Sequence, residues 1–178
     1  MTSHRLVRGV LTCWIAATIV SAAPAAADKP NFSGTWLVDQ ARSTSQTTPR
    51  PNADPKAPLP PPPPPPPPPG KTSPPHIVTH NDPVLTIQEG PGSYTLRLTT
   101  DGKENVNRQS NDRTHRSTSR WEGDKLVTQW TLEDNGERLA QGTDTRSLTE
   151  NGAVMIDDRT IKWPRLETSV HLVLKRRP

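Results

Sequence analysis

Histidines are common metal ligands and proton carriers, and four of them follow residue 27: His76, His80, His115 and His171. His76 and His80 lie four residues apart in a segment that alternates like a β-strand. At a rise of ~3.3 Å per residue, their side chains share one face but are roughly 13 Å apart. Metal–ligand distances of about 2 Å exclude a single ion bound by both. We therefore expect surface or cross-strand histidines and no metal site.

Acid–base and nucleophilic catalysis need side chains that converge, and the acidic pairs of this chain do not. Asp157-Asp158 and Glu133-Asp134 are neighbours in expected strands or turns, where adjacent side chains point to opposite faces. No serine lies in a G-x-S-x-G or S-x-x-K motif, and no glycine-rich phosphate loop occurs. The sequence thus predicts a protein that is not an enzyme and that uses no cofactor.

Arginines gather in one polar stretch of the chain: Arg108, Arg113, Arg116 and Arg120. Arg116 and Arg120 share an expected strand face with Thr114 and Thr118. One interpretation is a rim that contacts an anion, such as a phosphate, a lipid head group or a sulfated glycan. The other is the solvated outer face of a half-buried strand, with nearby carboxylates compensating the charge. We favour the outer face.

Aromatic residues on apolar strand faces are further candidates for ligand contact. Tyr94 shares a face with Leu96, and Trp130 shares one with Leu132. If these faces line an interior, both rings will border any ligand held there. The candidate ligand-binding residues are therefore Tyr94, Arg116, Arg120 and Trp130.

Short alternating segments separated by turn signals must position these residues. Asp101-Gly102, Asn135-Gly136 and Asn151-Gly152 are typical hairpin turns. No window shows helical periodicity, and no long crossover separates the segments. The pattern predicts eight to ten strands in an all-β, up-and-down antiparallel meander that closes into a barrel, because closure hides the sheet edges. The expected strands are 76–80, 84–89, 93–100, 114–121, 125–133, 138–149, 153–161 and a last strand around 170–174, while 105–111 is a polar stretch.

The segment Gly34-Thr35-Trp36, at the start of an expected first strand, resembles the G-x-W opening of lipocalins and fatty-acid-binding proteins. The hairpin at 121–127 and the closing segment 171–176 are similar to those of small exported lipocalin-like (calycin-type) bacterial proteins. That group is largely uncharacterised, so the resemblance implies a lipocalin-like barrel and no particular ligand. Fatty-acid-binding proteins hold a carboxylate with two interior arginines and a tyrosine, and no motif places such a set here.

The resemblance also implies structural roles for three residues. Gly34 would let backbone approach backbone where the first strand bends. Trp36 would plug the closed end of the barrel beneath a basic side chain near the final strand. Arg176 is the expected partner, with Arg159 and Lys175 as alternatives.

Residues 1–27 have the pattern of a secretory signal peptide. Arg5 and Arg8 precede an apolar run over 10–20 and the cleavage-site sequence Ala25-Ala26-Ala27. The run is shorter than the ~20 apolar residues that span a bilayer. We expect an exported protein, periplasmic or secreted, with no stable membrane span after cleavage. The only cysteine, Cys13, would be removed with the leader, so no disulfide is expected.

The processed chain would be nearly neutral. Removing Arg5 and Arg8 leaves 20 basic and 18 acidic residues. The basicity of the whole chain therefore belongs largely to the leader, and nucleic acid is not an expected partner.

A proline-rich stretch interrupts the expected single domain, 28–178, after its first strand. Residues 60–69 are ten consecutive prolines, which favour an extended polyproline II rod. We expect a disordered insert over about 42–75. It is either a spacer or a docking ligand for an aromatic-lined groove.

Two functional hypotheses follow. The first is an exported lipocalin-like barrel that binds a small apolar or amphipathic molecule in the cell envelope. The alternative is a structural or interaction module with a solid interior, whose proline rod contacts a partner or the cell wall. A continuous interior cavity of ~300–1,000 Å³ would favour ligand binding. Neither hypothesis specifies the oligomeric state.

Overall fold

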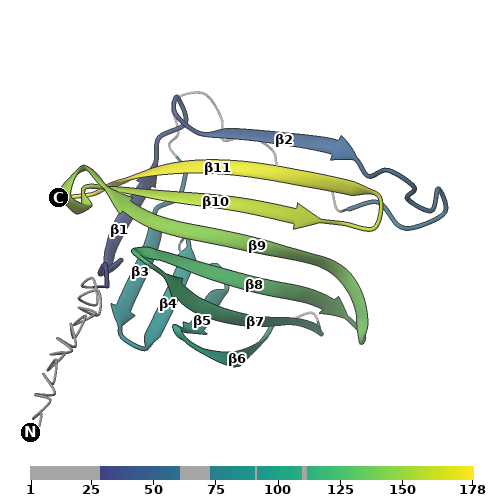
Figure 1. Cartoon of the computed structure of the whole chain (residues 1–178), viewed down its shortest axis with the longest axis horizontal. Coiled ribbons are helices and arrows are strands. Elements are labelled where there is room, and N and C mark those ends of the chain that lie inside the picture. Colours follow the sequence, from purple (N-terminus) through teal and green to yellow (C-terminus); the bar gives the residue numbers. More distant parts are fainter. Residues whose placement is uncertain (1–28, 61–72, 91, 110–111) are drawn as a thin grey trace, which may run out of the picture.

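One antiparallel sheet wraps almost completely around the interior of this protein (Figure 1). The computed structural model describes residues 29–60, 73–90, 92–109 and 112–178. The expected signal peptide therefore lies outside the described residues. The strands are β1 (Gly34–Val38), β2 (Thr44–Pro49), β3 (His76–Asn81), β4 (Val84–Glu89), β5 (Thr95–Thr99), β6 (Asp101–Arg108), β7 (Arg113–Glu122), β8 (Lys125–Asp134), β9 (Glu137–Thr149), β10 (Val154–Lys162) and β11 (Leu166–Arg176). The one helical element in this part of the chain is the 3-10 turn η1 (Glu150–Gly152).

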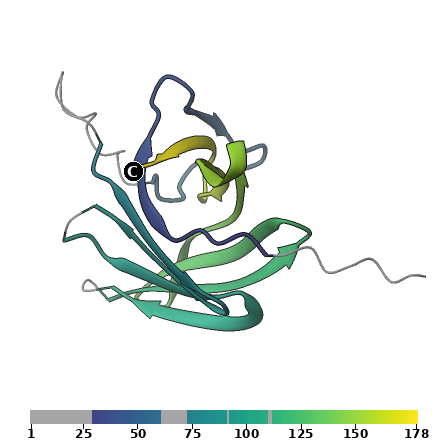
Figure 2. The same ribbon diagram turned by 90° about the vertical axis from the view of Figure 1, so that its left-hand side faces the viewer.

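Strand order follows the predicted meander. The neighbours run β5-β4-β3-β1-β11-β10-β9-β8-β7-β6, with β2 beside β11. The first strand, β1, pairs with β11 on one side and with β3 on the other, so it joins the two ends of the meander. Figure 2 views the long strands from one end and shows the C-terminus beside β1. The all-β, up-and-down, nearly closed barrel predicted from the sequence is confirmed.

Side-chain amides close the remaining seam, between β5 and β6. Asn107 Oδ1 accepts a hydrogen bond from the Arg97 backbone N–H at 2.9 Å, and Asn107 Nδ2 donates to the Arg97 carbonyl at 2.8 Å. This amide thereby replaces a backbone partner. Asn105 Nδ2 adds a hydrogen bond to Thr99 Oγ1 at 3.1 Å. Most of the polar stretch at 105–111 is therefore strand β6, which the sequence analysis missed because its inward residues are amides and not apolar side chains.

The expected insert at 42–75 is partly ordered, which corrects its predicted boundaries. Thr44–Pro49 form β2, which pairs with residues 166–171 of β11. All six β2 side chains are exposed, so no apolar alternation marked the strand. Backbone hydrogen bonds hold β2 against the part of β11 that does not pair with β1. Most of the proline run, residues 61–69, lies outside the described residues.

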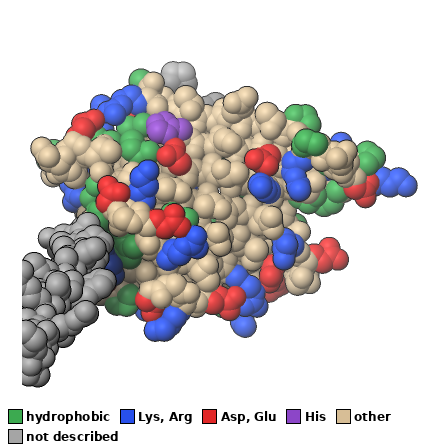
Figure 3. Space-filling model, in the orientation of Figure 1, with side chains coloured by type: hydrophobic (Ala, Val, Ile, Leu, Met, Phe, Trp, Pro, Cys, Tyr) green, Lys and Arg blue, Asp and Glu red, His purple; other side chains and the backbone are tan. Residues whose placement is uncertain are grey.

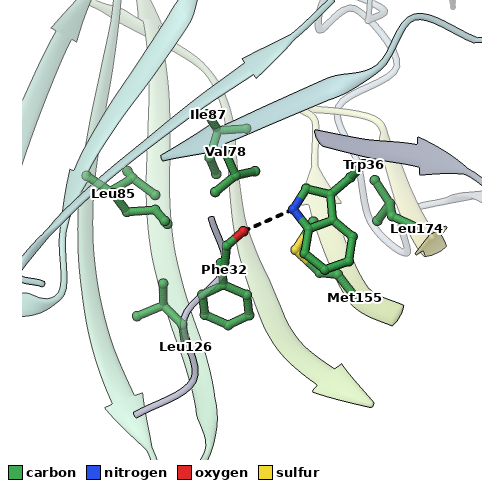
Figure 4. Packing of buried hydrophobic residues seen from close by; sticks show 9 residues of the cluster. Phe32, Trp36, Val78, Leu85, Ile87, Leu126, Met155 and Leu174 are labelled. Carbon is green, nitrogen blue, oxygen red and sulfur yellow. Dashed lines mark hydrogen bonds between the residues drawn. The ribbon is translucent and has the colours of Figure 1, made fainter. Parts of the chain in front are cut away.

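The apolar core packs around Phe32 and Trp36 (Figure 4). Phe32 and Trp36 are fully buried at its centre. Trp36 Nε1 donates a hydrogen bond to the Phe32 carbonyl at 3.0 Å, which satisfies the one polar atom of the indole. The other members of the cluster are Val78, Leu85, Ile87, Leu98, Leu126, Met155 and Leu174.

Arg176 covers Trp36, as the resemblance implied. Its guanidinium carbon lies 4.5 Å from the centroid of the Trp36 ring, a cation–π distance. Arg176 Nη1 also donates to the Ser33 carbonyl at 2.6 Å, and Nε donates to the Gly152 carbonyl at 3.0 Å. A Cβ on Gly34 would lie 3.2 Å from Arg176 Nη1, and Gly34 has φ +149°. Glycine is therefore required here both for its backbone conformation and for the close approach of the arginine.

Replacing Trp36 with alanine should lower the free energy of unfolding by roughly 3–5 kcal/mol, because it removes a fully buried side chain and opens a cavity. Equilibrium urea unfolding measures this change. Trp163→Ala is the matched control, since Trp163 is only partly buried, in the β10–β11 turn. Equal losses in the two variants would refute the assignment of Trp36 to stability.

Candidate functional site

Ionised side chains occupy the interior beyond the apolar core. Asp144 and Arg146 lie on β9, Asp157 and Arg159 on β10, and Glu89 at the end of β4. The register of β9 and β10 places Asp157 opposite Arg146 and Arg159 opposite Asp144. Each acid therefore faces a base on the neighbouring strand, on the face that points inward.

Close contacts join these five side chains, which we call the interior ion cluster. Arg146 Nη2 lies 2.9 Å from Asp144 Oδ2, and Arg146 Nε lies 3.2 Å from Asp157 Oδ2. Arg159 Nη2 lies 2.7 Å from Asp157 Oδ2 and 2.8 Å from Glu89 Oε1. The cluster thus runs without a break from Asp144 to Glu89.

Charge pairing keeps the buried groups ionised. Burial alone would raise the pKa of Asp157, but the charges of Arg146 and Arg159 outweigh it and hold that pKa below the usual value. Burial would also raise the pKa of Glu89, and Arg159 again reverses the effect. Burial lowers the pKa of Arg159, but Asp157 and Glu89 more than compensate and raise it. These three groups are therefore charged at neutral pH.

A cavity of about 340 Å³ adjoins the interior ion cluster. This volume lies within the ~300–1,000 Å³ of typical small-molecule sites. Asp144, Arg146, Arg159 and Glu89 form its charged side, and Ser93, Gln109 and His115 add polar groups. The apolar and aromatic part of the lining consists of Ile87, Tyr94, Leu96, Trp130, Leu132 and Ile161.

Trp130 links the cavity wall to the ion cluster. Its Nε1 donates a hydrogen bond to Asp144 Oδ1 at 2.9 Å, and its ring stacks on His115 with centroids 5.5 Å apart. Trp130 lies opposite Gly142 on β9. A Cβ at Gly142 would be 2.5 Å from Trp130 Cζ2 and 2.5 Å from the Thr160 carbonyl oxygen. Only glycine leaves room for the ring in this position.

Two nitrogens that belong to cavity-lining residues lack partners within the described part of the chain. Arg146 Nη1 is buried without a hydrogen-bond acceptor, and His115 Nδ1 is buried without a partner. Burial lowers the pKa of His115, so its imidazole is neutral at neutral pH and offers one donor and one acceptor. Buried polar atoms of this kind usually have partners, but both nitrogens are enclosed by the surrounding side chains and do not reach the cavity surface.

The four predicted candidates separate into two groups. Tyr94 and Trp130 both line the cavity. Arg116 and Arg120 alternate along β7 with buried Ser117 and Ser119, and therefore point outward. Each is paired with a carboxylate: Arg116 Nε lies 3.3 Å from Glu133 Oε2, and Arg120 Nη2 lies 2.7 Å from Glu122 Oε1. This arrangement agrees with the favoured outer-face interpretation.

The face of the molecule drawn in Figure 3 carries both signs of charge. Figure 3 shows basic and acidic side chains interspersed on the visible face, without an extended patch of either sign. Within the described part of the chain, no group of three or more histidine, cysteine or acidic side chains is arranged to hold a metal ion. Among those residues there is also no helix long and apolar enough to cross a membrane.

Sequence reasoning missed the interior ion cluster. It treated Asp157 only as a member of an adjacent acidic pair, and Arg159 only as an alternative partner of Trp36. Arg159 instead lies in the cluster, bonded to Asp157 and Glu89. The available signal was a repeated D-x-R pattern, Asp144-Thr145-Arg146 and Asp157-Asp158-Arg159, on strands joined by a hairpin. Alternate positions in a strand share a face, so both pairs point the same way.

No protein-family model matches the chain, and comparison with curated proteins finds no match.

Substituting alanine for Gly142 should push the Trp130 ring away from Asp144, because the new methyl group has no space. We expect a loss of about 1–3 kcal/mol of stability from overpacking, together with altered tryptophan fluorescence. Gln141→Ala, at an exposed neighbouring position, is the control. Unchanged fluorescence and stability in Gly142→Ala would contradict the packing described.

Acid should weaken the fold through Asp157. Its pKa is lower in the folded protein than in the unfolded chain, so its contribution is present above the unfolded value of ~3.9 and is lost as pH falls through the folded value. Asp157→Asn should remove this part of the pH dependence. It should also cost roughly 3–5 kcal/mol at neutral pH, by leaving two arginines underpaired.

Urea unfolding at a series of pH values between 7 and 3 measures both effects. Asp158→Asn is the control, because that neighbouring carboxylate points outward and is exposed. Equal pH slopes in Asp157→Asn and the parent protein would rule out Asp157 as the acid-sensitive group.

Proposed function

We propose that this protein binds a small amphipathic molecule inside a lipocalin-like barrel and acts as a carrier or sink for it. The observation that carries the proposal is the cavity of about 340 Å³, partly open to solvent, with one apolar side and one charged side. Sites for small molecules commonly combine an apolar wall with a few placed polar groups. A ligand with an apolar body and a polar head matches this division.

The two sides of the cavity suggest how such a ligand lies. Its body packs against Leu96, Leu132 and the ring of Trp130. Its head group lies on the charged side, beside Arg146, Arg159 and Glu89. Because Trp130 is held by Asp144 and stacks on His115, this wall is ordered before a ligand arrives, which lowers the entropic cost of binding.

The proposal contains no chemical step. The ionised groups beside the cavity are committed to one another through contacts of 2.7–3.2 Å. We further propose that the barrel belongs to the calycin type and functions in the cell envelope. This part rests on the leader pattern at 1–27 and on the G-x-W opening, together with the position of Trp36 under Arg176.

Titration of the purified protein with N-phenyl-1-naphthylamine, an uncharged fluorescent apolar probe, tests ligand binding. We expect saturable binding of one probe per chain, with energy transfer from Trp130. Leu132→Trp should weaken binding at least tenfold, because the larger ring fills the cavity that Leu132 lines.

Gln129→Trp is the matched control, since Gln129 is exposed and its neighbour Trp130 points inward. Absence of saturable binding would refute the proposal and favour the interaction-module alternative. Equal binding by Leu132→Trp and the parent would show that the probe binds elsewhere, and would refute the assignment to this cavity.

A further inference from the structure

We propose that the cavity selects a ligand whose head group is a cation, such as a primary ammonium, over a ligand whose head group is neutral or a carboxylate. This inference rests on the proposed function and names the class of ligand for the same site. It depends on three observations: the charge balance of the interior ion cluster, the exposure of Glu89 and the aromatic rings that border the cavity.

Carboxylates outnumber guanidinium groups in the cluster. Each of its two arginines lies within 3.2 Å of two of its three acids, so the five groups carry a formal charge of minus one. The two histidines beside the cluster, His76 and His115, add no positive charge at neutral pH, because burial lowers the pKa of both imidazoles. The cavity lining described here contains no lysine and no arginine outside the cluster. A cationic head group would balance this charge, whereas a ligand carboxylate would add to it.

Glu89 is the charged group of the cluster that a ligand reaches most easily. Its side chain is 49% exposed, against 18% for Arg159 and 4% for Arg146. The two carboxylate oxygens of Asp144 already accept hydrogen bonds, one from Trp130 Nε1 and one from Arg146 Nη2. A head group on the charged side of the cavity therefore meets the Glu89 carboxylate, while the guanidinium groups are largely covered.

The aromatic part of the lining also suits a cation. The rings of Tyr94 and Trp130 border the cavity, and the π faces of such rings attract ammonium groups. A neutral head group gains neither this attraction nor the full attraction of Glu89. Because the cavity is partly open to solvent, an ammonium group beside Glu89 keeps part of its hydration, which reduces the cost of desolvating its charge.

The volume of the cavity sets the size of the ligand. About 340 Å³ corresponds to roughly eleven water volumes at ~30 Å³ each. A ligand of roughly ten non-hydrogen atoms therefore fits, which is about the size of octylamine. Its chain would pack against Leu96 and Leu132, and its ammonium group would donate to the carboxylate of Glu89.

Displacement of bound N-phenyl-1-naphthylamine by octylamine, octan-1-ol and octanoate at pH 7 tests the selectivity. These compounds have the same number of carbon atoms and differ in the charge of the head group. We expect octylamine to displace the probe at a concentration at least fivefold lower than either of the other two. Octan-1-ol or octanoate binding as well as octylamine, or none of the three displacing a bound probe, would overturn this inference and leave the proposed function intact. Failure of the probe itself to bind would overturn both.

A charge variant tests the cause of the selectivity. Glu89→Gln removes one negative charge from the exposed edge of the cluster, so the variant should fold. It should lower the ratio of the octan-1-ol to the octylamine dissociation constant at least threefold. Glu133→Gln is the matched control, because Glu133 pairs with Arg116 on the outer face, and it should leave the ratio unchanged. An unchanged ratio in Glu89→Gln, or an equal change in both variants, would refute the assignment of the selectivity to Glu89.

Discussion

Pairing of β1 with both β11 and β3 is the constraint on which the rest of the structure depends. These contacts join the beginning, the middle and the end of the chain, and so convert a meander into a nearly closed barrel. Trp36 anchors the junction, with Arg176 stacked over its ring and bonded to the Ser33 and Gly152 carbonyls. Since the only cysteine of the chain is Cys13, non-covalent contacts alone hold this junction together. Without this junction the sheet would stay open, and it would not have a buried inner face and an exposed outer face.

Closure creates an interior that the sequence fills in two different ways. Near Trp36, apolar side chains pack against one another, and the rings of His80 and Trp121 pack beside Phe32. Farther along the same strands, the inward positions of β9 and β10 carry two D-x-R pairs, and their register aligns opposite charges. Charged side chains cannot close over an empty volume as flexible apolar ones do, because each is held by its partners. The cavity therefore lies beside the ion cluster and not within the apolar core.

The sequence predicts this fold well where turn chemistry and alternation coincide. Asn135-Gly136 correctly separated β8 from β9, and the G-x-W segment correctly placed Trp36 under a basic side chain. The hairpin turn predicted at Asp101-Gly102 was wrong, because these residues begin β6, which pairs with β7 and not with β5. The prediction failed where polar residues hold neighbouring strands together. Asn107 closes the seam by replacing a backbone partner, and β2 is held by backbone hydrogen bonds and by a hydrogen bond between the Thr47 and Thr168 hydroxyls. Of the cavity lining, only Tyr94 and Trp130 were predicted. The ion pairs between β9 and β10 depend on the register of the two strands, and the alternation of residue types within a strand does not reveal that register.

The interior ion cluster is difficult to explain as a device for stability. Desolvating several charges costs about as much as their mutual attraction returns, and apolar replacements for buried ion pairs are often neutral or stabilising. A barrel that needed only to be stable would fill these positions with residues like Leu126 or Met155, which occupy equivalent inward positions on β8 and β10. The cluster instead forms one side of a cavity and carries one more acid than base. Under the function proposed above, these charged groups line the binding site, and we assign them to the specificity of binding and not to stability.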